Sequence, residues 1–273
     1  MTPLIGPATG ADGCVHVMTF NLRGPEDPAP HRWADRRSVV EELLRAEQPT
    51  ILGTQEGRWP HIRDLAEALR PTHDWVGLGR SGGSRSEYTA IFYDFVRLEL
   101  LAYDHIWLSS IPKLIGSRTW GNIQHPRMLT WAAFLDRATE REFAVINTHF
   151  DHVSPLARTR SAHLVRRLTT RKLHRARRPV LLTGDFNAGP GSRPYEVLTH
   201  DGLFRDTWTG APERIGPDVR TWNGYTDPAP GPRIDWILAD RRWRVERAAV
   251  NTSRPDGLHP SDHWPVQALV RPV

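Results

Sequence analysis

Cysteine is almost absent from this sequence, because Cys14 is the only one among 273 residues. A single thiol excludes a disulfide within the chain and a metal cluster built on several thiolates. Without disulfides, the default location is the cytoplasm, where thiols stay reduced. We therefore expect a cytoplasmic protein, although a cysteine-poor secreted protein would have the same composition.

Long apolar runs are also absent, and no stretch approaches the roughly 18 residues that a membrane span requires. Residues 1–13 have neither a basic start nor an apolar run, so they do not resemble a secretory signal. Their prolines and glycines indicate a flexible leader. No repeat or proline-rich linker divides the remainder, which we expect to form a single domain over residues 14–273.

Acidic residues are in a slight minority, since 31 Asp and Glu face 36 Lys and Arg and the net charge is +5. A basic chain favours a polyanionic partner such as a phosphate ester or nucleic acid, although many basic proteins bind neither. The charge is concentrated in a helix expected over Pro155–Arg177, which could follow a nucleic-acid backbone or simply present a solvated face. Nothing in the sequence indicates an obligate protein partner.

Strands and helices alternate along the first seventy residues. Apolar strands are expected over Val15–Leu22 and Thr50–Glu56, with helices that begin at Asp35 as N-cap and at Pro60. Four β-rich runs follow and suggest an antiparallel meander: 88–93, 98–108, 129–135 and 142–149. The pattern is consistent with two sheets packed face to face and helices outside.

Polar side chains recur where the expected strands end. They are Asn21, Glu56, His149, Asp185 with Asn187, Asp235, and Asp262 with His263. If these ends converge, four carboxylates share one pocket, and they cannot all stay ionised without a cation. Mg²⁺ or Mn²⁺ suits oxygen ligands, whereas zinc is less expected because no paired histidine motif or cysteine cluster is present.

The same set holds the parts for metal-assisted hydrolysis of a phosphate ester. Histidines with acidic neighbours provide acid and base groups near neutral pH. Asp235 is the candidate to orient His263 by a hydrogen bond. Neutral or cationic donors in the same pocket would hold the non-bridging phosphate oxygens.

Six motifs in order resemble the endonuclease/exonuclease/phosphatase superfamily, which includes deoxyribonuclease I, abasic-site endonucleases, inositol polyphosphate 5-phosphatases, neutral sphingomyelinases and deadenylases. They are the motifs around Asn21 (MTFNLR), Glu56 (GTQEG), His149 (NTH), Asp185 and Asn187 (GDFN), Asp235 (RIDWI), and Asp262 and His263 (SDH). The resemblance spans about residues 15–270, and its details are similar to the compact bacterial metal-dependent hydrolases. It implies an α/β fold, a four-layer α/β sandwich with the site at one edge of the two sheets.

The resemblance also implies a role for each matching residue in the metal site. Glu56 would be the principal Mg²⁺ (or Mn²⁺) ligand, with Asn21 beside it. Asp262 would complete the metal site.

For the reaction itself, the resemblance implies that Asp185 activates or orients the attacking water. Asn187 and His149 would bind phosphoryl oxygens. His263, oriented by Asp235, would contact the scissile phosphate or act as an acid or base.

Further residues have a weaker basis. Arg127 and Glu87 are candidate substrate-binding residues, against the alternatives of a surface arginine and a solvated loop acid. Three loop tryptophans, Trp120, Trp208 and Trp222, could stack on a base or sugar. Structural or solvent roles are expected for four other polar residues, Asp151, His105, His125 and His152.

These observations predict a Mg²⁺-dependent phosphoesterase that hydrolyses a phosphodiester, either a nuclease or a nucleotide-directed phosphodiesterase. The alternative is a phosphatase for a small phosphorylated sugar, inositol or lipid headgroup. A non-catalytic binding module on the same fold is disfavoured, because no expected acid or imidazole is missing.

Overall fold

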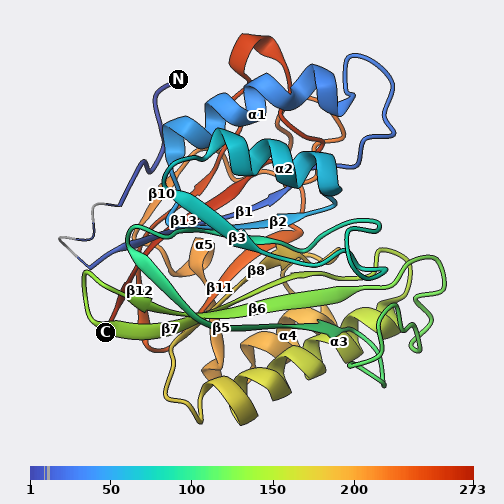
Figure 1. Ribbon diagram of the computed structural model, residues 1–273, viewed down its shortest axis with the longest axis vertical. Coiled ribbons are helices and arrows are strands. Elements are labelled where there is room, and N and C mark those ends of the chain that lie inside the picture. Colours follow the sequence, from blue (N-terminus) through green and yellow to red (C-terminus); the bar gives the residue numbers. More distant parts are fainter. Residues whose placement is uncertain (9, 11–12) are drawn as a thin grey trace.

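The computed structural model describes residues 1–8, 10 and 13–273 (Figure 1). Two β-sheets pack face to face and helices cover both outer faces, so the chain forms four layers. This arrangement confirms the predicted four-layer α/β sandwich. Among the described residues, no helix combines the length and the apolar character needed to cross a bilayer.

The first sheet has seven strands in the order β10-β12-β13-β1-β2-β4-β3. Near its centre, β1 (Val15–Asn21) runs parallel to β2 (Ile51–Gln55) and antiparallel to β13. The other strands of this sheet are β3 (His73–Val76), β4 (Ile91–Asp94), β10 (Glu213–Ile215), β12 (Trp243–Val250) and β13 (Val266–Pro272).

The second sheet has six strands in the order β5-β6-β7-β8-β11-β9. In its centre, β7 (Arg141–His149) runs parallel to β8 (Val180–Asp185), and β11 (Asp235–Asp240) runs antiparallel to β8. The remaining strands are β5 (Leu98–Trp107), β6 (Met128–Asp136) and β9 (Phe204–Asp206).

Helices α1 (Trp33–Glu47) and α2 (Trp59–Ala68) cover the outer face of the seven-stranded sheet. Helices α3 (Pro155–Leu168) and α4 (Arg193–Thr199) cover the outer face of the other sheet, and the short α5 (Thr207–Gly210) packs against β11 and β12. Two short 3₁₀ turns lie at residues 200–202 and 255–257.

Alternation along the strands creates three apolar layers. Val17 and Leu181 lie in the core between the two sheets. Phe20 points to the opposite face of β1 and packs with Leu43 of α1, and Ile146 belongs to the core beneath α3 and α4. Side chains at the ends of β1, β2, β7 and β8 that continue the inward-facing set therefore meet at one edge of the sandwich.

At this edge the two sheets approach very closely. A Cβ on Gly53 of β2 would lie 2.4 Å from Oγ1 of Thr183 and 2.7 Å from Oδ1 of Asn147, so only glycine fits between the sheets. The Asn147 amide donates to the carbonyls of Thr54 and Ala90, and its oxygen accepts from Gln55 and Thr183. Asn147 thus fastens the two sheets together beneath the site.

Three local predictions were wrong, and the first two concern β4 and the start of α1. The run that contains β4 was expected in a meander with β5, β6 and β7, but β4 pairs with β2 and β3 in the other sheet. Asp35 is not the N-cap of α1, which is Arg32; Asp35 lies in the first turn and accepts from the Arg32 side chain. The first prediction failed because the order of strands along a chain does not reveal where the chain crosses between sheets. The second failed because the Asp35 carboxylate pairs with the Arg32 side chain, so no side chain caps the helix N-terminus.

The expected helix over Pro155–Arg177 is α-helical only to Leu168 and continues as a π-helical turn over Thr169–Leu173. The hydroxyls of Thr169 and Thr170 donate to carbonyls four residues back, a bond that loosens a helix.

The predicted flexible leader, residues 1–13, includes positions outside the described part of the chain. The amides of residues 4–6 donate to the Glu47 carboxylate at 2.8–3.2 Å. The division into a leader over residues 1–13 and a single domain over residues 14–273 stays a prediction.

Candidate active site

Strand register sets the polar residues of the six-stranded sheet side by side. His149 at the end of β7 is paired with Asp185 at the end of β8, and Asp185 is paired with Asp235 at the start of β11. Paired residues on neighbouring strands point to the same face of the sheet. All three side chains are buried and face the other sheet, which contributes Asn21 and Glu56.

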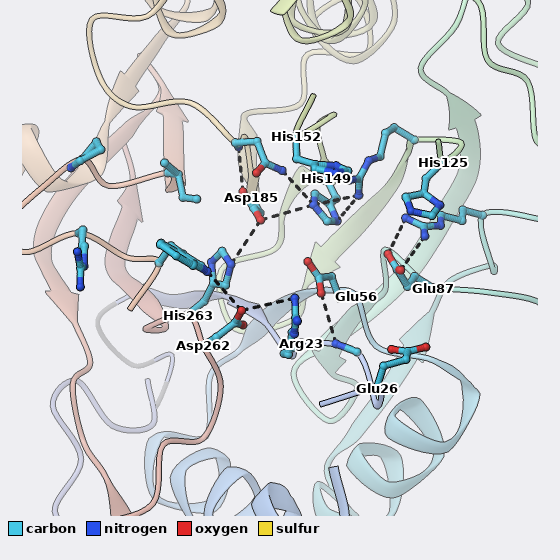
Figure 2. Close-up of a pocket in the computed structure, with 18 residues that line it drawn as sticks. Arg23, Glu26, Glu56, Glu87, His125, His149, His152, Asp185, Asp262 and His263 are labelled. Atoms are coloured by element: carbon cyan, nitrogen blue, oxygen red, sulfur yellow. Dashed lines mark hydrogen bonds and ion pairs between the residues drawn. The ribbon is translucent and has the colours of Figure 1, made fainter. Parts of the chain in front are cut away.

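Asp185 lies at the centre of this set (Figure 2). Its Oδ2 accepts a hydrogen bond from Nδ2 of Asn21 at 3.0 Å and lies 3.5 Å from Nε2 of His149 and 3.9 Å from Nε2 of His263. Its Oδ1 accepts from the backbone N–H of Asn187 at 2.9 Å. Burial and the neighbouring charge of Asp235 raise the pKa of Asp185 to about 7.

His263 forms the predicted pair with Asp235, with 2.9 Å between Nδ1 and Oδ2. Burial alone would lower the pKa of His263, but the charge and hydrogen bond of Asp235 outweigh it and hold that pKa well above its usual range. Nδ1 therefore carries a proton, and Nε2 is the ring nitrogen that faces Asp185.

Glu56 begins a second corner of the site. Glu56 has a left-handed backbone conformation with φ of 60°. Its carboxylate accepts hydrogen bonds from Nδ2 of Asn21 at 3.0 Å and from the Gly24 N–H at 3.3 Å. Burial opposes ionisation, but the charge of His263 and the Asn21 bond hold the pKa of Glu56 below its usual range. Glu56 is therefore an ionised carboxylate that faces the pocket.

The donor set fits a divalent cation. Glu56, His149 and Asp185 each offer a ligand atom within 4.8 Å of the others, and Asp185, Asp235 and His263 do the same. A positive ion would stabilise the ionised form of Asp185, whose pKa is raised by burial, beside the carboxylates of Glu56 and Asp235. This is an acidic and histidine-containing site of the kind that a metal ion occupies.

Asp262, which the resemblance assigned to the metal, belongs to neither of these two groups in the described part of the chain. Its Oδ2 lies 3.7 Å from Nη1 of Arg23 and accepts the indole N–H of Trp222 at 3.3 Å. Burial raises the pKa of Asp262. Its place at the pocket edge agrees with the prediction, while its role as a ligand stays a prediction.

One wall of the pocket is cationic. Nη1 of Arg127 lies 2.9 Å from Nδ1 of His149, and Nη2 lies 2.9 Å from Nδ1 of His152. Arg127 is only 5% exposed, so it is no ordinary surface arginine. Burial and the charge of Arg127 hold the pKa of His149 well below its usual range, which makes His149 a neutral donor or acceptor beside a fixed positive charge.

Glu87 lies in the same wall but does not point freely into the pocket. Both of its oxygens form ion pairs of 2.6 Å with the two terminal nitrogens of Arg80. Burial raises the pKa of Glu87, although the charge of Arg80 opposes the shift. Its direct contact is therefore with Arg80, and we interpret Glu87 as the residue that holds this arginine at the pocket.

Asn187 closes the floor of the pocket. Its backbone is left-handed with φ of 49°, and its Nδ2 donates to the Phe150 carbonyl at 3.1 Å and lies 3.2 Å from Nε2 of His149. Phe186 points the opposite way and stacks on Trp236 in the core at 4.3 Å. The predicted alternation after β8 is therefore present.

Together these residues line an open pocket of about 710 Å³. In Figure 2, Asp185, His149 and Glu56 lie between His263 on one side and His125 on the other. Sequence reasoning missed several lining residues that no motif marks, namely Arg80, Glu26, Arg220 and Pro232, and it gave no role to Ile234, which lies within the RIDWI motif.

Residues with an expected structural role divide into two groups. Asp151 accepts from the amides that precede α3, and His105 bonds Thr130, as expected of structural residues. His125 and His152 instead line the pocket. Only their positions in the sequence, two residues before Arg127 and three residues after His149, could have indicated this.

A protein-family model described as the Endonuclease/Exonuclease/phosphatase family matches residues 18–263. The chain is 29% identical over 226 residues to Protein angel of Drosophila melanogaster, which covers 77% of this chain. The match spans 59% of the length of Protein angel.

Two solved structures from Bacteroides thetaiotaomicron are similar over almost the whole chain. An endonuclease/exonuclease/phosphatase family protein is 30% identical with a TM-score of 0.87, covering 95% of this chain and 98% of that one. A mannosyl-6-phosphatase is 29% identical with a TM-score of 0.88, covering 94% and 99%. The similarity therefore includes the layers, the sheets and the edge at which the pocket lies.

Proposed function

This chain belongs to the endonuclease/exonuclease/phosphatase family, whose members are hydrolases of phosphate esters, and from that premise we propose that it hydrolyses a phosphodiester with water and a bound Mg²⁺ or Mn²⁺ ion. One observation carries the proposal. The buried Asp185 carboxylate lies within 4 Å of Nε2 of both His149 and His263, on the floor of an open pocket with a cationic wall.

Each residue has a role that its contacts support. Asp185 orients the attacking water and accepts its proton, because its carboxylate is fixed by Asn21 and by the Asn187 amide. His263, charged and held by Asp235, stabilises the negative charge that develops on the phosphate.

The remaining groups bind the phosphoryl oxygens. Asn187 and the neutral His149 offer donors, and Arg127 adds a positive charge directly behind His149. A divalent cation held by Glu56 with Asn21, and completed by Asp262, would neutralise charge on the phosphate in the transition state.

The shape of the pocket favours a diester. It extends from the reaction centre toward Trp222 on the His263 side and toward His125 on the opposite side. A phosphodiester carries an organic group on each side of the phosphorus, and both groups find a wall here. A monoester would leave one side unused.

A phosphatase for a small phosphorylated sugar, inositol or lipid headgroup is the second candidate. The observation that favours it is the 29% identity to the mannosyl-6-phosphatase over 94% of this chain. The reacting groups are the same in both cases, so only the choice of ester differs.

The test is a comparison of bis(p-nitrophenyl) phosphate with p-nitrophenyl phosphate in Mg²⁺, with Asp185→Ala as the blank. The diesterase proposal expects the higher kcat/KM on the diester. A higher value on the monoester supports the phosphatase. Metal binding without turnover of any phosphate ester, including DNA, RNA, nucleotides, sugar phosphates and phospholipids, would indicate a non-catalytic module instead.

A further inference from the structure

We propose that Trp222 is a stacking platform for a nucleobase attached to the phosphate that this site binds. The inference rests on the proposed function only for the position of the phosphate, beside Asp185 and His263. It makes Trp222 a specificity-determining residue and gives the substrate class as a nucleotide ester.

Trp222 is held rigidly beside the reaction centre. Its backbone forms a β-bridge with His263, and the neighbouring Asn223 N–H donates to the Asp262 carbonyl at 2.7 Å. The Thr221 hydroxyl accepts the backbone N–H groups of Ile234 and Asp235 at 2.9 and 3.1 Å. A ring fixed in this way is pre-organised and loses little freedom when a ligand stacks on it.

The orientation of the indole is fixed as well. Its N–H donates to Oδ2 of Asp262 at 3.3 Å, so the polar edge faces the acidic corner. A Cβ on Gly224 would lie 3.3–3.4 Å from the six-membered ring, so the backbone of Gly224 packs against the indole.

Trp222 nevertheless remains 51% exposed and lines the pocket, whereas Trp120 and Trp208 are 7% and 3% exposed. Of the three loop tryptophans predicted as candidates for stacking, only Trp222 therefore offers ring surface to a ligand.

The chemistry of this side of the pocket favours a flat heterocycle. Pro232 and Ile234 line the pocket with Trp222 and give this side apolar surface, next to the polar groups of Arg220 and of the corner formed by Asp262 and His263. A sugar ring needs polar partners for several hydroxyls, whereas a base gains most of its stacking energy from its face. The polar groups of the opposite wall, among them Arg80 and Arg127, lie across the reaction centre.

Calorimetry with thymidine 5′-monophosphate and deoxyribose 5-phosphate separates the base from the rest of the ligand. The titrations use the full chain with Mg²⁺ and the substitution Asp185→Ala, which prevents hydrolysis. With Trp222 present, we expect the nucleotide to bind about 10-fold more tightly than the sugar phosphate. Trp222→Ala should abolish this difference and leave sugar-phosphate affinity within about 2-fold, a change small against one stacked base.

Two variants separate stacking from the bond to Asp262. Trp222→Phe keeps an aromatic face and removes the indole N–H, so we expect it to retain most of the preference. Trp59→Ala is the matched control, because Trp59 is 45% exposed but lies outside the pocket lining. It should leave both affinities unchanged.

Equal affinities of the two ligands in the presence of Trp222 would overturn the stacking inference alone. An equal loss in Trp222→Phe and Trp222→Ala would also overturn it, since the N–H bond would then be the important contact. No binding of either ligand would contradict the phosphate site and with it the inference.

Discussion

Nδ1 of His263 and Oδ2 of Asp235 lie 2.9 Å apart, and both residues are buried. Asp235 begins β11 of the six-stranded sheet, whereas His263 lies in the segment that leads into β13 of the seven-stranded sheet. This bond keeps the proton on Nδ1 and directs Nε2 toward Asp185, 3.9 Å away.

Asp235→Asn tests this relationship. The amide is nearly isosteric but cannot balance the positive charge of His263, so the imidazolium loses its main stabilisation. We expect kcat/KM on a phosphodiester to fall about 100-fold or more, as for the loss of an acid–base group. Steady-state kinetics measures the loss, and circular dichroism checks that the fold is retained.

Asp240→Asn is the matched control at the other end of the same strand. Asp240 is buried and accepts from the Val180 N–H, His174 and Arg242, far from the reacting groups. This variant should lower the melting temperature and leave kcat/KM nearly unchanged. A larger loss of activity in Asp240→Asn than in Asp235→Asn would refute the assigned role of the Asp235–His263 pair.

Removal of the metal tests the acidic corner. EDTA should abolish activity, and Mg²⁺ or Mn²⁺ should restore it, because the clustered carboxylates need a cation to act together. Mg²⁺ should also raise the melting temperature of the wild-type chain, since a ligand that binds only the folded state stabilises it. Glu56→Gln should lose most of that shift. Full activity in chelator would exclude the proposed mechanism.

Much of this site could be predicted because it lies in regular structure. Asn21, His149 and Asp185 end apolar strands, so the sequence marked them as polar groups at strand ends. Their convergence was only a condition of that prediction, and it arises from the pairing of β7 with β8 and from the packing of the two sheets. The resemblance supplied the order of the motifs. The pair of Asp235 with His263 was expected on the same basis and is present.

Other features depend on tertiary contacts that leave no periodic signal. Arg80 reaches the pocket through a glycine-rich loop and is held by Glu87, seven residues later. Asn147 lies in the NTH motif and near the end of its strand, which gave it no role of its own, yet its amide joins the two sheets. The sheet that β4 joins depends on a chain crossing that local pattern does not encode.

The basic face of α3 leads to a third prediction. Arg158 and Arg166 bond to backbone carbonyls, whereas Arg160 and Arg167 of α3 and Arg171 of the π-helical turn that follows it are exposed. We expect these three arginines to contact the backbone of a nucleic-acid substrate. Replacing all three with glutamine should weaken binding of single-stranded DNA and reduce the slope of log affinity against log salt by about 2, because each lost phosphate contact contributes about 0.7.

The control removes three arginines from the opposite outer face, Arg45, Arg63 and Arg70, which lie on or directly after α1 and α2. This variant has the same net charge as the α3 variant. Fluorescence anisotropy at several salt concentrations measures both. Equal slopes in the two variants would mean that only net charge matters, and salt-independent activity on small esters would favour the phosphatase.

The raised pKa of Asp185 leads to the last prediction, which concerns stability. In the unfolded chain this carboxyl titrates near about pH 4, but burial and the charge of Asp235 raise its folded pKa to about 7. The folded state thus keeps a proton that the unfolded state has lost, so its stabilising contribution disappears as the pH rises through 7. Asparagine cannot ionise, so the melting temperature of Asp185→Asn should be about 5 °C above that of the wild type at about pH 8. The difference should vanish at about pH 4.

The melting curves are measured in EDTA, because a bound cation would stabilise the ionised carboxylate and hide the effect. Asp136→Asn is the control of opposite sign. Burial opposes ionisation of Asp136, but two hydrogen bonds from Arg97 at 2.6 and 3.0 Å hold its pKa below the usual range. That variant should be less stable than wild type near about pH 8, and its deficit should shrink only as the pH falls below about 4. A stabilisation of Asp185→Asn that does not change with pH would show that packing, and not the charge of Asp185, opposes folding at this site.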